Sequence, residues 1–239
     1  MEGIARWFML AAVVSALGGM VWGIQMSASQ DHLLSPAHGH LNLLGWVSCA
    51  IYAFYYHLLP AAAGGVLPRL HLAAALLALG LLLCALGDYC LFRDGEGAFM
   101  AGVGAFAAGH LAYAVLFLTR EASDPARLLQ MPGIAIAAAL LVLGLVMARI
   151  LAPRAGALKG PVLAYIPIIL SMGAAAATLP GQGALVWALP AALAFVASDV
   201  VLAFETFVLP EGHRFRRIAP YAVWPLYWGA QLGFWYAFS

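Results

Sequence analysis

Two aspartates lie inside apolar stretches of this sequence. Asp88 follows the run LLALGLLLCALG (76–87), and Asp199 interrupts ALVWALPAALAFVASDVVLAF (184–204). An ionisable side chain in a bilayer is costly unless it faces protein or water and has a partner, so both are functional candidates. A carboxyl group can donate a proton when protonated and accept one when ionised. Two of them indicate a shared polar site for acid–base chemistry.

Other polar side chains occur in the same apolar stretches or at their ends. Each has an ordinary structural interpretation, since a buried histidine or glutamine can bond across helices and a tyrosine can pack at the membrane interface. Those that we interpret as substrate-binding candidates are His38, Asn42, His110, Tyr165, Tyr221 and Gln231.

The composition determines the class of protein that must position these side chains. The 239 residues are 65% hydrophobic and 9% charged, whereas a soluble domain carries roughly 25% charged residues. The net charge of +1 gives no indication of nucleic-acid binding. The three cysteines, Cys49, Cys84 and Cys90, have no CxxC spacing and are expected to be buried thiols. The chain is therefore predicted to be an integral, multi-pass membrane protein, in the bacterial inner membrane.

The apolar segments predict an all-α bundle that forms a single transmembrane domain over residues 1–239. A helix needs about 20 apolar residues to cross the hydrocarbon core, and prolines punctuate the ends of many candidates. The first segment is long for a signal peptide and is interpreted as a retained span. The eight predicted spans are about 4–26, 38–60, 68–90, 98–118, 131–150, 161–179, 184–207 and 218–238.

This topology brings the polar groups to one side of the membrane. Spans 3 and 7 run in the same direction, and Asp88 and Asp199 both lie in their later parts. Spans 2, 4, 6 and 8 start from the side on which spans 3 and 7 end. His38, Tyr165 and Tyr221 lie early in spans 2, 6 and 8, and His110 lies about midway along span 4. We therefore predict one cavity that both carboxyl groups face, with His110 on its wall. His38 and Asn42, four residues apart on one helical face, are expected to line it too, and His40 to point elsewhere.

Four motifs carry a family resemblance. The segments LGDYCLFRDGEGAFMAGVGAFAAGHLAYAVLF (86–117), AYIPIILSMGAAA (164–176), ALAFVASDVVLAFETF (192–207) and PLYWGAQLGFW (225–235) occur in order. Together they resemble the YhhN/TMEM86 family of lysoplasmalogenases over about residues 70–236. The resemblance places Asp88 at the family's Gly-Asp position and Asp199 at its Ser-Asp position.

The resemblance implies a reaction. Lysoplasmalogenases cleave the vinyl-ether bond of 1-alkenyl lysophospholipids, giving a fatty aldehyde and a glycerophospho-alcohol, and no cofactor is expected. Protonation of the β-carbon creates an oxocarbenium ion, water adds to the α-carbon, and the hemiacetal collapses. A protonated carboxylic acid can supply the proton, and a carboxylate can stabilise the cation and deprotonate water. The residues alone leave open which aspartate is the proton donor and which is the base. The expected partners are the lysophospholipid substrate and membrane lipids.

The N-terminal part supports an alternative. The segment SPAHGHLNLLGWVSCAIYAFYYHLLP (35–60) resembles His-rich segments in small relatives of haem-copper oxidase subunit I. His38 and His40 point about 200° apart on a regular helix, so they can share a metal only if the segment before Leu41 is not helical. A haem- or metal-binding membrane protein that uses His38, His40 and His110 is the second hypothesis, and a small transporter is the third.

Overall fold

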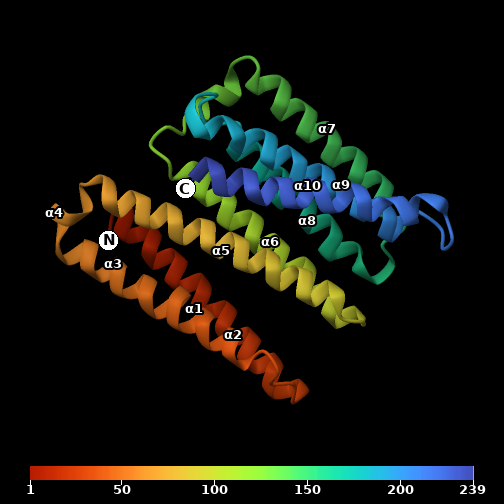
Figure 1. Ribbon diagram of the computed structural model, residues 1–239, viewed down its shortest axis with the longest axis horizontal. Helices are drawn as coiled ribbons and strands as arrows, with labels where there is room; N and C mark the ends of the chain where they lie inside the picture. Colours follow the sequence, from red (N-terminus) through yellow and green to blue (C-terminus); the bar gives the residue numbers. More distant parts are fainter. Residues whose placement is uncertain (239) are drawn as a thin grey trace. The chain divides into compact units, whose positions relative to one another are not determined.

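The computed structural model describes residues 1–238, which form helices and short connections with no strand in that range (Figure 1). The chain divides into two compact units, Met1–Leu72 and Ala73–Ser239. The prediction of one transmembrane domain over residues 1–239 stays a prediction, and each unit is described by itself.

The first unit is a helical hairpin. Helix α1 (Gly3–Ser29) packs against a second helical stretch made of α2 (Ser35–His40), the π-helix η1 (Leu41–Ser48) and α3 (Cys49–Leu58). The short helix α4 (Pro60–Ala63) follows. Small residues allow close contact between the two arms, because a Cβ on Gly19 would overlap the Asn42 amide and one on Gly45 would overlap Ser15.

The second unit is built from long helices. Helix α5 (Val66–Phe92) begins in the first unit and continues into the second. The remaining helices are α6 (Glu96–Leu118), α7 (Gly133–Leu151), α8 (Lys159–Ala176), α9 (Ala188–Phe207) and α10 (Arg214–Phe238), with short 3₁₀ turns η2 (Pro125–Leu129), η3 (Gly156–Leu158) and η4 (Gly183–Trp187). Helix α9 lies along α10, and α8 packs against α6, α7 and α9 (Figure 1).

An aromatic core joins the helices of the second unit. Tyr113 and Phe117 of α6, Phe195 of α9 and Phe234 of α10 are fully buried. The ring of Phe234 lies 4.6 Å from that of Tyr113 and 5.3 Å from that of Phe117, measured between centroids. These contacts fix how α6, α9 and α10 are rotated about their own axes.

Glycines bring α5 close to α6. A Cβ on Gly80 would overlap the ring of Tyr113, and a Cβ on Gly87 would lie 2.6 Å from Cδ2 of Phe106. Membrane helices associate through such close approaches, because lipid supplies no hydrophobic force between them. Gly87 precedes Asp88, so this contact also positions the first aspartate.

Six helices are long and apolar enough to span a membrane among residues 1–238, fewer than the eight predicted. They are Gly3–Ser29, Val66–Phe92, Glu96–Leu118, Gly133–Leu151, Gly156–Ala176 and Gly183–Phe207. The other two predicted spans are also helical, but they differ from these six in length or composition. Residues 35–58 are divided by the π-helix into shorter pieces, and α10 is rich in tryptophan, tyrosine and proline. The all-α, polytopic class is confirmed, and the count of eight is not.

Candidate active site

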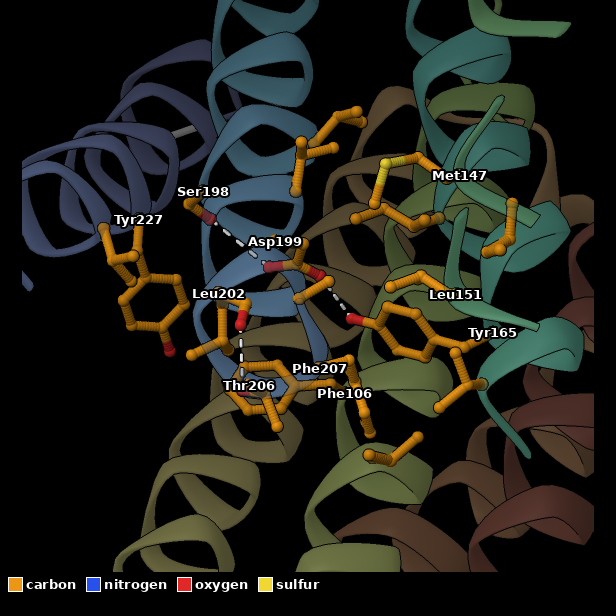
Figure 2. A pocket seen from close by; sticks show the side chains of 18 of the residues that line it. Phe106, Met147, Leu151, Tyr165, Ser198, Asp199, Leu202, Thr206, Phe207 and Tyr227 are labelled. Carbon is orange, nitrogen blue, oxygen red and sulfur yellow. Dashed lines mark hydrogen bonds between the residues drawn. The ribbon is translucent and has the colours of Figure 1, made fainter. Parts of the chain in front are cut away.

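The second unit contains a cavity of about 490 Å³ bounded by α5 to α10 (Figure 2). Its wall is mainly apolar and includes Phe99, Leu143, Met147, Ile166 and Phe207. Six hydroxyl- or carboxyl-bearing residues interrupt that wall: Asp88, Tyr165, Ser198, Asp199, Thr206 and Tyr227. Both aspartates therefore lie at one cavity, from helices far apart in the sequence.

Asp199 is held at the cavity by two hydroxyl groups. Tyr165 of α8 donates a hydrogen bond to its Oδ2 at 2.5 Å (Figure 2). The Ser198 hydroxyl lies 3.3 Å from its Oδ1 and shares its one hydrogen between that oxygen and the Phe195 carbonyl oxygen at 2.8 Å. The side chain of Asp199 is 19% exposed. This bond from another helix fixes the orientation of the Asp199 carboxyl.

His110 lies behind Asp199 and does not line the cavity, which corrects the prediction that it forms part of the wall. Its side chain is fully buried, and Nε2 is 3.9 Å from Oδ2 of Asp199. Nδ1 lies 2.5 Å from the carbonyl oxygen of Phe106, one turn earlier in α6. The aromatic rings of Phe195 and Tyr165 pack against the imidazole. A role of His110 in substrate binding stays a prediction.

Asp88 has a hydrogen-bond partner that is not among the predicted site residues. Tyr227 of α10 donates a hydrogen bond to Oδ2 of Asp88 at 2.7 Å, and Asp88 is exposed. Each aspartate thus accepts a hydrogen bond from a tyrosine of another helix. One feature of the sequence could have identified Tyr227 as a candidate. It lies four residues before Gln231, which puts both polar groups on one face of α10.

Two predicted binding residues of α10 lie away from the cavity wall. Tyr221 is 81% exposed, because it precedes Tyr227 by six positions, a step that turns a helix by about 240°. Gln231 is buried, and its Oε1 accepts a hydrogen bond from Tyr113 at 2.5 Å. Neither residue is among those that line the cavity. The hydrogen bond of Gln231 is a contact between α6 and α10.

His38 and Asn42 belong to the first unit and are not among the lining residues. Nε2 of His38 lies 2.9 Å from the carbonyl oxygen of Gly19, and the Asn42 amide donates to the carbonyl oxygen of His38 at 2.9 Å. The expected shared face of His38 and Asn42 is present, and His40 bonds instead to the Pro36 carbonyl of its own helix. Their roles in substrate binding stay predictions.

Residues 1–238 bring together no group of three or more histidine, cysteine, aspartate or glutamate side chains suited to a metal ion. His38 and His40 lie in a helical turn of α2, which is the geometry that separates their imidazoles. The described part of the chain therefore offers no set of metal ligands that would support the metalloprotein hypothesis.

Long apolar helices and a mainly apolar cavity that holds two carboxyl groups define a polytopic membrane protein with an acid-containing site. The chain belongs to the YhhN family, whose profile matches residues 44–237. The match begins inside the His-rich segment and leaves out His38, His40 and Asn42. No curated protein and no solved structure matches the chain.

Proposed function

We propose that this protein is an integral-membrane hydrolase that cleaves the vinyl-ether bond of lysoplasmalogens. The observation that carries the proposal is the placement of Asp88 and Asp199 at one mainly apolar cavity in a chain of the YhhN family. The products are a fatty aldehyde and a glycerophospho-alcohol.

The cavity suits a lipid with one long chain. Its volume of about 490 Å³ lies within the range of roughly 300–1,000 Å³ that is usual for small-molecule sites. Each methylene of an alkenyl chain placed against this wall contributes about 0.8 kcal/mol of apolar burial. The carboxyl groups then meet the substrate where the apolar chain joins the polar glycerol.

Depth along the helices distinguishes the two acids. Asp199 is eight residues from the end of α9, about 12 Å at the helical rise, whereas Asp88 is four residues from the end of α5, about 6 Å. The proton must reach the β-carbon, which is one bond further along the alkenyl chain than the carbon that water attacks. The deeper Asp199 is therefore assigned as the proton donor, and the more exposed Asp88 as the base that meets water.

These roles give a balanced cycle. Asp199 gives its proton to the β-carbon, and the α-carbon becomes part of an oxocarbenium ion that the Asp88 carboxylate stabilises. Water bonds to the α-carbon as Asp88 takes its proton, which yields the hemiacetal. The Asp199 carboxylate then removes the hemiacetal hydroxyl proton, the bond to the glycerol oxygen breaks, and that oxygen takes the proton from Asp88. Both acids return to their starting states, as in glycosidases that alternate acid and base roles.

The test measures aldehyde release by the purified protein from a lysoplasmenyl phospholipid. Asp88→Asn and Asp199→Asn should each lower kcat by about 10²–10⁴-fold, the usual contribution of general acid–base catalysis. Glu205→Gln is the matched control, because Glu205 lies on α9 but is not among the lining residues.

Absence of aldehyde with the folded wild-type protein would reject the proposal, and full activity in either asparagine variant would remove that acid from the mechanism. A Soret band in the same preparation would instead favour a haem protein.

A further inference from the structure

His110 presents an unpaired nitrogen inside the protein. Its Nδ1 faces the carbonyl oxygen of Phe106 at 2.5 Å, and a carbonyl only accepts, so Nδ1 carries the hydrogen. In a neutral imidazole Nε2 is then a bare acceptor. That atom is fully buried and has no hydrogen-bond partner among residues 1–238. A buried acceptor without a donor is rare and calls for an explanation.

The group in front of this nitrogen is the carboxyl of Asp199. Oδ2 of Asp199 lies 3.9 Å from Nε2 of His110, about 1 Å beyond hydrogen-bonding distance. The same oxygen accepts the Tyr165 hydroxyl hydrogen, so Tyr165 has no hydrogen left for the imidazole. The Ser198 hydroxyl faces the other carboxylate oxygen. The only hydrogen that these neighbours can offer to Nε2 is one carried by the Asp199 carboxyl itself.

We propose that His110 is a positioning residue that holds a proton on Asp199 by accepting a hydrogen bond from its Oδ2 at Nε2. The inference rests on the proposed function, in which Asp199 is the proton donor. A small movement of the carboxyl closes the gap, and catalytic hydrogen bonds are often long before substrate binds. The charged and titratable groups near the pair are Tyr165 from α8, Cys84 and Asp88 from α5, and Tyr227 from α10.

The arrangement also explains why the imidazole is enclosed. The rings of Phe195 and Tyr165 lie 4.5 and 5.5 Å from it, measured between centroids, so water does not compete for Nε2. The proton therefore stays on the aspartate until a substrate carbon takes it, and the hemiacetal hydroxyl restores it.

Infrared spectroscopy of the substrate-free protein tests the inference. The wild type at neutral pH should show the carbonyl band of a protonated carboxyl, which Asp199→Asn removes and Asp88→Asn retains. His110→Phe keeps a ring in the same aromatic surroundings but has no nitrogen, and it should shift or abolish that band and lower kcat by about tenfold, part of the roughly 10²–10⁴-fold that general acid catalysis supplies. His110→Gln retains a hydrogen-bond acceptor, so it should recover part of the carbonyl band and part of the kcat that His110→Phe loses.

His71→Phe is the matched control, because it replaces another imidazole packed between aromatic rings, those of Phe8 and Tyr52. It should leave the band unchanged. No protonated-carboxyl band from Asp199, or an unchanged band in a folded His110→Phe variant, would overturn the inference. Because the band is measured without substrate, the expected band changes in a protein that releases no aldehyde would reject the proposed reaction and leave the His110–Asp199 contact standing.

Discussion

Tyr227 of α10 donates a hydrogen bond to Asp88 of α5 over 2.7 Å, although 139 residues separate them in the sequence. The bond joins the last helix to the helix that carries the first acid, and both residues line the cavity. It fixes the orientation of the Asp88 carboxyl through its Oδ2.

Replacing Tyr227 with phenylalanine should therefore reduce activity. A hydrogen bond to a charged group contributes about 1.5–3 kcal/mol, so kcat for aldehyde release should fall by roughly 10- to 100-fold. Tyr221→Phe is the control, because that tyrosine of the same helix is 81% exposed and does not line the cavity. Equal activities of the two variants would show that the Tyr227 hydroxyl does not assist Asp88.

The size of the cavity should determine which chain lengths are cleaved. Val103 of α6 lines the cavity, and Val103→Trp should fill part of the space that an alkenyl chain occupies. We expect kcat/KM for long-chain substrates to fall by about tenfold, because each excluded methylene forfeits about 0.8 kcal/mol. Shorter chains should lose less.

Leu111→Trp provides the control on the same helix, since Leu111 is 48% exposed and lies outside the cavity wall. A loss of kcat/KM that is the same for every chain length would contradict this position for the chain.

The contact between Tyr113 and Gln231 should stabilise the fold without taking part in the reaction. Both side chains are buried, and Tyr113→Phe leaves Oε1 of Gln231 without its donor. The expected cost is about 1–3 kcal/mol of folding free energy, measured as faster thermal inactivation in detergent. At low temperature, kcat should stay near that of the wild type. A variant with normal thermal stability but low kcat would return Gln231 to the substrate site.

His38 should matter more to the stability of the first unit than His40 does. Nε2 of His38 lies 2.9 Å from the Gly19 carbonyl oxygen of α1, whereas His40 is exposed and bonds to the Pro36 carbonyl oxygen of its own helix. Loss of the hydrogen bond between the two arms is expected to cost about 1 kcal/mol. Thermal unfolding of His38→Ala and His40→Ala compares the two. Equal stabilities would mean that the His38 contact contributes nothing to the hairpin.

The sequence by itself determined the class of protein, the family and most of the helix positions. Long apolar segments form helices in a bilayer because every backbone polar group must be satisfied within the segment, and the predicted ranges lie close to α1 and α5 to α10. The two aspartates stood out for a related reason, since a carboxyl group in apolar sequence is costly wherever the helix faces.

Only the tertiary structure decided which polar groups meet. Helices surrounded by lipid are apolar on nearly every side, so the sequence pattern does not show how each is rotated about its axis. That rotation comes from close packing, such as Gly87 against Phe106 and Phe234 against Tyr113. It turned Tyr227 toward Asp88 and left Tyr221 exposed, and it placed His110 behind Asp199. Side-chain contacts between distant segments decide these orientations, and no local pattern encodes them.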